Sequence, residues 1–143
     1  MKIEIAFCIL YMQRLERICK QLKHDNNTSM TITSHILDTS CGKPAVNVLM
    51  ILEKEIKEDE WIVIGQCRSN GDGRNGSSLN DNVNMDNGNY RMIFHMKEYF
   101  EAQNITDYFY PKVIIQFQIT ACGEHYHIPL LINPFGYTTY RGS

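Results

Sequence analysis

The sequence predicts an all-β domain in which two β-sheets pack face to face as a sandwich. Several segments alternate apolar and polar residues with a period of two, which would turn the apolar side chains of each strand to one face. Residues that favour turns separate these segments, and only one internal stretch, 97–103, has the spacing of a helix. Many short strands divided by turn signals are typical of a β-sandwich.

The strands follow one another along the chain with few interruptions. The predicted strands are 46–52, 61–67, 90–96, 113–119 and 125–132. Glu58 and Asp59 lie between the first two strands and predict a hairpin turn there. After the last strand, the segment 133–136 has proline second and glycine fourth, which favours a type I turn.

Two features depart from this simple pattern. Residues 70–89 are rich in asparagine and glycine, and we expect a long loop with one short strand around Leu79. Long loops inside compact domains are usually functional or disordered. Pro129 falls inside the strand 125–132, and because proline has no N–H to donate, we expect an edge strand or a bulge at this position.

Composition limits the class of protein. A chain of 143 residues has room for one domain with a hydrophobic core, and 43% apolar and 21% charged residues are ordinary for a globular domain. The net charge of −2, without a long basic run, argues against a nucleic-acid partner and favours a small molecule or another protein. The five cysteines are widely spread and form no Cys-x-x-Cys pair, which argues against a zinc ribbon and a disulfide framework.

The first 33 residues are predicted to be a leader and linker, with the domain at 34–143. The apolar run 5–12 is far shorter than the ~20 residues that span a bilayer, so no membrane anchor is expected. It could be the core of a secretory signal, but the residues after it offer no small-residue cleavage site.

A peroxisomal address is the favoured alternative for this leader. Arg14-Leu15 and Gln21-Leu22, separated by five residues, resemble the amino-terminal address read by the peroxisomal import receptor. The expected location is the peroxisome, with the import receptor as a partner, and the cytoplasm is the alternative.

The histidines are the residue type best suited to acid–base chemistry here. His125 and His127 are two apart on a predicted strand, so they share a face, and histidine titrates near neutrality. With His35 they could form a zinc site, but no cysteine or carboxylate lies at a supporting spacing, so we expect no metal and no cofactor. The chain has no Gly-x-Ser-x-Gly motif and no activated cysteine, which favours direct attack by water over an acyl-enzyme.

Three blocks of sequence carry a family resemblance that extends over residues 34–143. They are Ser34-His35-Ile36-Leu37-Asp38-Thr39 with Gly42-Lys43-Pro44-Ala45, then Gly71-Asp72-Gly73-Arg74, and finally His125-Tyr126-His127 with Gly136-Tyr137-Thr138-Thr139-Tyr140-Arg141-Gly142-Ser143. Together they resemble the transthyretin-related hydroxyisourate hydrolases. The resemblance implies an eight-stranded, two-sheet transthyretin-like sandwich with one short helix, and a homotetramer with its sites in the channel between dimers.

The resemblance also implies a reaction, namely hydrolysis of 5-hydroxyisourate, a purine derivative, to 2-oxo-4-hydroxy-4-carboxy-5-ureidoimidazoline. The residues expected to act in catalysis are His35, Arg74, His127 and Ser143, and those expected to bind substrate are His35, Arg74, His125 and Tyr140. His127, helped by His35, would deprotonate the water, while Arg74 would stabilise charge on the carbonyl oxygen.

Two other classes of function remain open on the sequence. A transthyretin-type carrier would bind a small ligand in the same channel without catalysis, but such carriers lack the Tyr-Arg-Gly-Ser end and the histidine pair found here. A generic interaction module with a β-sandwich fold would leave the terminal motif unexplained.

Overall fold

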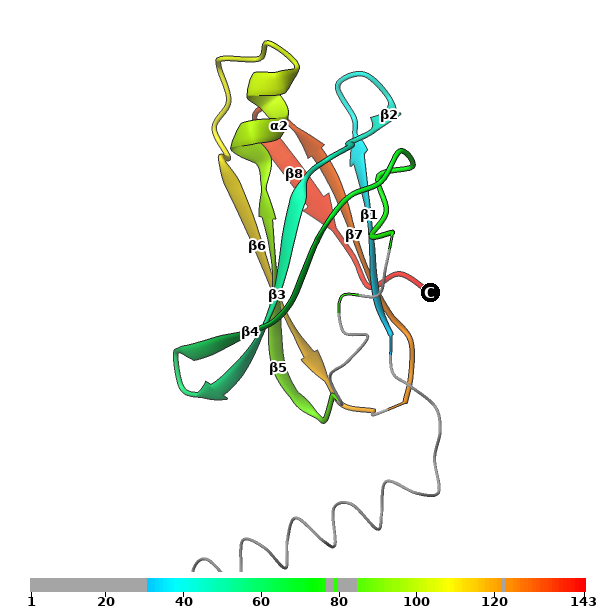
Figure 1. Cartoon of the computed structure of the whole chain (residues 1–143), viewed down its shortest axis with the longest axis vertical. Coiled ribbons are helices and arrows are strands. Elements are labelled where there is room, and N and C mark those ends of the chain that lie inside the picture. The colour runs from blue at the N-terminus through cyan, green and yellow to red at the C-terminus, as the bar shows by residue number, and fades with distance from the viewer. Residues whose placement is uncertain (1–30, 77–78, 80–84, 122) are drawn as a thin grey trace, which may run out of the picture.

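The computed structural model describes residues 31–76, 79, 85–121 and 123–143, which form eight strands and one helix (Figure 1). The elements are β1 (Ile32–Asp38), β2 (Lys43–Pro44), β3 (Leu49–Lys57), β4 (Glu60–Arg68), β5 (Gly88–His95), α2 (Met96–Ala102), β6 (Lys112–Ile119), β7 (Tyr126–Asn133) and β8 (Gly136–Thr139). In this part of the chain no helix is long and apolar enough to cross a membrane.

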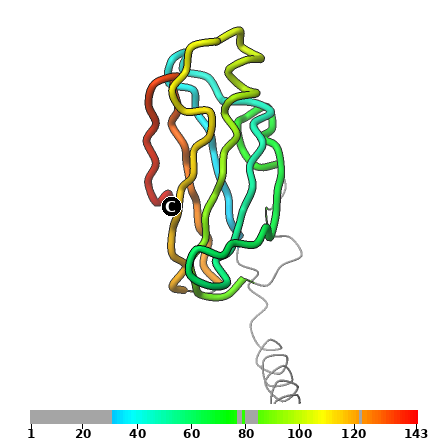
Figure 2. Tube along the Cα trace, turned by 90° about the vertical axis from the view of Figure 1, so that its left-hand side faces the viewer, coloured from blue at the N-terminus to red at the C-terminus, as the bar shows by residue number. Residues whose placement is uncertain are grey.

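The strands form two four-stranded sheets that pack as two layers. Sheet A has the order β2-β1-β7-β8 and sheet B the order β4-β3-β5-β6. Neighbouring strands are antiparallel except β1 and β7, which run parallel in the centre of sheet A. Figures 1 and 2 show the layers side by side, with α2 at one end. The predicted two-sheet, eight-stranded sandwich with one short helix is therefore confirmed.

The core lies between the sheets because alternate residues of each strand point inward. The largest fully buried side chains are Ile32, Ile36, Met50, Leu52, Tyr90, Met92, Phe94, Met96, Phe100, Ile119, Leu130 and Ile132. Asp38 is also buried, where it accepts hydrogen bonds from the Tyr99 hydroxyl (2.9 Å) and the Ser40 backbone N–H (2.8 Å). This carboxylate fixes α2 against the end of β1.

Several local expectations hold, and others need correction. The hairpin at Glu58 and Asp59 joins β3 to β4, and the turn at 133–136 joins β7 to β8. The apolar run at 46–52 becomes strand only from Leu49, because Asn47 adopts a positive φ of 64°. Leu79 lies in a turn rather than a strand.

The first strand starts earlier than the polar pattern indicated. β1 begins at Ile32, so Ile32 and Thr33, which were expected to end the linker, belong to the sheet. They pair with the first two residues of β7, and Ile32 is fully buried. Burial of Ile32 and the long pairing with β7 outweigh the polar character of the residues around it.

Pro129 is in an interior strand, which corrects the expectation of an edge or a bulge. β7 lies between β1 and β8, and the pairs Leu130 with Thr139 and His127 with Gly142 keep one register. The backbone of His127 faces the carboxy-terminal segment, since its carbonyl accepts from Gly142 N–H, and Pro129, two residues on, faces the same way. Pro129, which has no N–H to donate, therefore faces the chain just past the end of β8. Its carbonyl accepts a hydrogen bond from the Thr139 hydroxyl at 2.8 Å.

Candidate active site

The outer face of sheet A, which points away from sheet B, holds a pocket of about 510 Å³. Its lining residues are Thr33, Ser34, His35, Arg74, Asn75, His125, His127, Pro129, Tyr140, Gly142 and Ser143. All six residues expected at the site therefore line one pocket, although they come from four separate parts of the chain.

Strand periodicity explains the place of the histidines. Thr33 and His35 alternate with buried residues on β1, so both face outward. His127 is the register partner of Thr33 on β7 and faces the same way, half-buried. His125 lies two residues earlier and is exposed, and its ring centroid is 6.2 Å from that of His127. The shared face expected for the His-x-His pair is present in the structure.

Arg74 reaches the site because its loop runs along the edge of β1. Ile36 N–H donates to the Gly73 carbonyl at 2.8 Å, and Arg74 forms an antiparallel bridge with His35. Bridge partners turn their side chains to the same face of a sheet, so Arg74 lies beside His35. Gly73 has a φ of +73°, and an added Cβ would lie 2.4 Å from the Ile36 carbonyl oxygen, so this approach requires glycine.

Asn75 is a residue of the site that the sequence did not single out. Its side-chain oxygen accepts from Ser34 N–H at 2.7 Å, and its amide donates to the Ile32 carbonyl at 3.1 Å. It thus continues the pairing of the loop with β1 beyond Arg74. An asparagine-rich stretch gave no signal to distinguish this residue from its neighbours.

The pocket keeps His127 uncharged near neutrality. Burial lowers the pKa of His127 below its usual value, and the nearby charges of Arg74, His125 and His35 lower it further, while a hydrogen bond with the Thr33 backbone raises it. Among the pocket-lining residues there is no aspartate or glutamate. A neutral imidazole in a basic pocket can accept a proton from water.

The carboxy-terminal segment packs directly against His127. Gly142 N–H donates to the His127 carbonyl at 2.9 Å, and a Cβ on Gly142 would meet Cδ2 of His127 at 2.3 Å. Only glycine allows this contact. Tyr140 remains 60% exposed at the rim, where its ring can cover a bound molecule, and Ser143 is exposed beside it.

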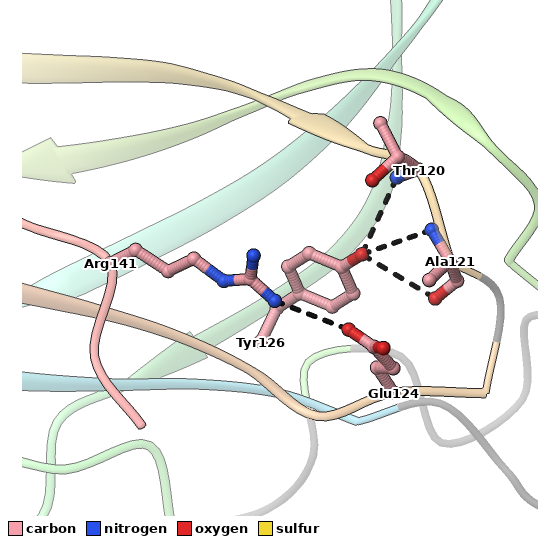
Figure 3. A network of polar contacts seen from close by, with 5 residues as sticks. All are labelled: Thr120, Ala121, Glu124, Tyr126 and Arg141. Carbon is pink, nitrogen blue, oxygen red and sulfur yellow. Dashed lines mark hydrogen bonds and ion pairs between the residues drawn. The ribbon is translucent and has the colours of Figure 1, made fainter.

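Arg141 points away from the pocket, unlike the other residues of the terminal motif. Its guanidinium lies 5.1 Å from the Tyr126 ring centroid and forms an ion pair with Glu124 at 3.2 Å (Figure 3). The Tyr126 hydroxyl accepts from the backbone N–H of Ala121 at 3.2 Å. Arg141 therefore anchors the tail to the turn that precedes His125.

The described residues offer no group of three histidine, cysteine, aspartate or glutamate side chains placed to hold a metal ion. What the fold and pocket define is a small β-sandwich with a polar, histidine-rich pocket for a small molecule on one outer face. Residues 32–142 match the model of the HIUase/Transthyretin family. The chain belongs to this family.

Individual relatives agree with this assignment. The chain is 38% identical over 115 residues to the 5-hydroxyisourate hydrolase of Salmonella typhi, covering 80% of this chain and 82% of the relative. The solved structure of Klebsiella pneumoniae 5-hydroxyisourate hydrolase is 31% identical, with a TM-score of 0.65 over 80% of this chain and 94% of that chain. Sea bream transthyretin in complex with thyroxine is 26% identical, with a TM-score of 0.71 over 78% of this chain and 94% of that chain.

Proposed function

We propose that this chain hydrolyses 5-hydroxyisourate to 2-oxo-4-hydroxy-4-carboxy-5-ureidoimidazoline, a reaction that opens a cyclic amide. The observation that carries the proposal is the pocket in which His35, Arg74 and His127 meet the carboxy-terminal tail. The similarity to curated 5-hydroxyisourate hydrolases over most of the chain supports the same reaction.

In this mechanism His127 is the general base. Its lowered pKa leaves the ring neutral at pH 7, so it can take a proton from a water molecule in the pocket. His35, on the neighbouring strand and the same face, holds that water for attack. The water oxygen bonds to the ring carbonyl carbon, the C–N bond breaks, and the leaving nitrogen receives the proton that His127 took from the water.

Arg74 binds the substrate and stabilises the charge that develops on the carbonyl oxygen. Its guanidinium donates from a rigid planar fork, which suits a flat, electron-rich ring. His125 and Tyr140 contact the substrate from the rim, and Ser143 closes the pocket with its hydroxyl. Arg141 contributes only by holding the tail in place, because its side chain lies on the other side of the strand.

The carrier function is less well supported. A carrier for an aromatic ligand needs a mainly apolar channel, whereas this pocket is lined by three histidines, an arginine and hydroxyl groups. Such groups suit a reaction that moves protons.

A direct assay tests the proposal. Urate oxidase generates 5-hydroxyisourate in the cuvette, and its ultraviolet decay is followed with and without this protein. We expect decay much faster than the spontaneous rate, and loss of this acceleration in Arg74→Ala purified in parallel. A folded protein that gives no acceleration would contradict the proposal and turn attention to ligand binding.

A homotetramer is the proposed assembly, with the sites in the channel between dimers. Two features support association. The pocket lies open on the outer face of sheet A, and apolar side chains are exposed on the edge strands, such as Ile114 of β6 at 49% and Tyr137 of β8 at 41%. Light scattering after gel filtration tests this, and we expect four times the chain mass of 16.6 kDa.

The peroxisome is the proposed location, with the import receptor as a partner. The leader that carries Arg14-Leu15 and Gln21-Leu22 lies outside the described residues, so its support is the sequence pattern alone. Residues 1–33 fused to a fluorescent protein should label peroxisomes, and Leu15→Ala should abolish this. Diffuse fluorescence of the unmodified fusion would favour the cytoplasm.

A further inference from the structure

Thr33 lies between the two histidines of the His-x-His segment. Its hydroxyl oxygen is 2.9 Å from Nδ1 of His127 and 2.7 Å from Nε2 of His125. The parallel pairing of β1 with β7 sets Thr33 directly beside His127, and all three side chains line the pocket. A continuous chain of two hydrogen bonds therefore runs along one wall of the site.

Two arrangements of this hydrogen-bond chain let the Thr33 hydroxyl donate to a histidine. A hydroxyl has one proton and two lone pairs, and a neutral imidazole has one N–H and one bare nitrogen, so when Thr33 donates to one imidazole it accepts from the other. If both imidazoles donate to Thr33 instead, His127 again carries its proton on Nδ1. In the first arrangement Nδ1–H of His127 donates to Thr33, which donates to Nε2 of His125. In the second, Nε2–H of His125 donates to Thr33, which donates to Nδ1 of His127.

Of the two arrangements in which Thr33 donates to a histidine, only the first suits a base. Nδ1 of His127 is engaged by Thr33, and among the described residues Nε2 has no hydrogen-bond partner, so Nε2 is the nitrogen free to meet water. In the first arrangement Nε2 is bare and can accept a proton. In the second arrangement Nε2 already carries the proton. Moreover, a His127 ring that has accepted a proton on Nε2 keeps its Nδ1–H bond to Thr33, so no side chain has to move.

We propose that Thr33 is a positioning residue that, with His125 as its acceptor, holds His127 in the Nδ1–H tautomer and keeps Nε2 available to accept a proton from water. This inference rests on the proposed function and deepens it. His125 gains a second task, which is to orient the Thr33 hydroxyl. The hydrogen bond made by one ring nitrogen commonly decides which nitrogen of a histidine carries the proton.

The electrostatics of the pocket fit this role. Burial and the charges of Arg74, His125 and His35 lower the pKa of His127, which favours the neutral ring at pH 7 and above. The tautomer of a histidine matters only while the ring is neutral. The competing explanation is that Thr33 is an ordinary β-branched strand residue, in which case valine would replace it without loss.

Nitrogen NMR of the full chain with ¹⁵N-labelled histidine tests the tautomer without any assay of activity. At pH 8 we expect His127, assigned by its loss in His127→Ala, to show a protonated Nδ1 and a bare Nε2. In Thr33→Val the share of the Nε2–H form should rise, because the hydroxyl is gone and only the contact with the backbone of residue 33 remains to hold Nδ1–H. A wild-type His127 that carries its proton on Nε2 would overturn the inference.

Kinetics with three variants test the consequence. Thr33→Val keeps the shape of the side chain and should lower kcat about 10- to 100-fold, while KM changes less than about threefold. Thr33→Ser keeps a hydroxyl and should recover most of kcat. The matched control is Thr138→Val, because Thr138 is the register partner of Leu131 on the same sheet and lies outside the pocket.

The outcomes separate this inference from the proposed function. A wild-type protein that does not accelerate the decay contradicts the function itself. An active wild type whose Thr33→Val variant keeps its kcat contradicts the role of Thr33 alone. If Thr33→Val unfolds, as judged by circular dichroism, then Thr33→Ser and the wild-type nitrogen spectrum still decide the question.

Discussion

The outer faces of the two sheets carry similar side chains in different settings. On sheet B, the Arg91 guanidinium pairs with Glu53 and lies 4.4 Å from the Trp61 ring centroid. On sheet A, Arg74 forms no ion pair among the described residues, and histidines and hydroxyl groups surround it instead of carboxylates. Each face thus has an arginine, but only one of the two is neutralised by the protein itself.

This difference distinguishes a structural group from a functional one. A paired and stacked arginine has its interactions satisfied within the fold and contributes to stability. The unpaired Arg74 lowers the pKa of His127, and its donors are left for a ligand. Groups that break a local rule of pairing without compensation are expected at functional sites. Matched substitutions on the two faces can test this contrast.

The largest effect is expected for the histidines. His127→Ala should lower kcat/KM about 10²- to 10⁴-fold, because it removes the general base. Its counterpart is His95→Ala, at the end of β5 on the outer face of sheet B, which should leave kcat/KM unchanged. The measurement is the ultraviolet decay of 5-hydroxyisourate. Equal losses in both variants would mean that the contrast between the faces concerns stability and not catalysis.

The arginines should separate activity from stability. Arg74→Met should lower kcat/KM about 10²- to 10³-fold with little change in unfolding, since a donor to the developing oxyanion is lost. Arg91→Met should keep its activity but lower the free energy of unfolding by about 1 kcal/mol, through loss of the ion pair and the stacking on Trp61. Decay assays and urea denaturation of both variants give the comparison. An active Arg74→Met would remove the arginine from the mechanism.

The contact between the tail and His127 should give an intermediate effect. Gly142→Ala places a methyl group 2.3 Å from the current position of Cδ2 of His127. The tail or the ring must shift, and we expect a loss in kcat of about 10- to 100-fold. Gly71→Ala is the control, because a Cβ there meets nothing within 4 Å. The two variants are compared by steady-state kinetics, and equal activities would show that the tail does not position the base.

The smallest effect is a shift in pH dependence. Because the pKa of His127 is lowered by burial, Arg74, His125 and His35, the acid limb of kcat/KM should lie below pH 6.5. His125→Asn removes one of these charges and should move the limb upward. The same shift affects stability. The unfolded chain binds the proton more readily, so stability falls as the pH drops from the unfolded pKa through the lowered folded one. An acid limb above pH 6.5 would contradict the assignment of His127 as the base.

Local patterns in the sequence were enough to predict much of the fold. Alternation with a period of two marks strands such as β6 and places His125 and His127 on one face, because successive side chains of a strand point to opposite sides. The turn at 133–136 and the helix α2 follow from equally local preferences. The blocks of resemblance named the histidines, Arg74 and the tail, but did not say how they meet.

Only the tertiary structure decided the relations between distant segments. Thr33 belongs to a polar stretch of sequence, and the parallel pairing of β1 with β7 places it against His127. The bridge from His35 to Arg74 fixes the position of the loop arginine. The tertiary structure also places Pro129 in an interior strand and turns Arg141 away from the site. Periodicity reports which way a side chain points within its own strand. Which strands become neighbours, and in what register, depends on burial and hydrogen bonding summed over the whole sandwich.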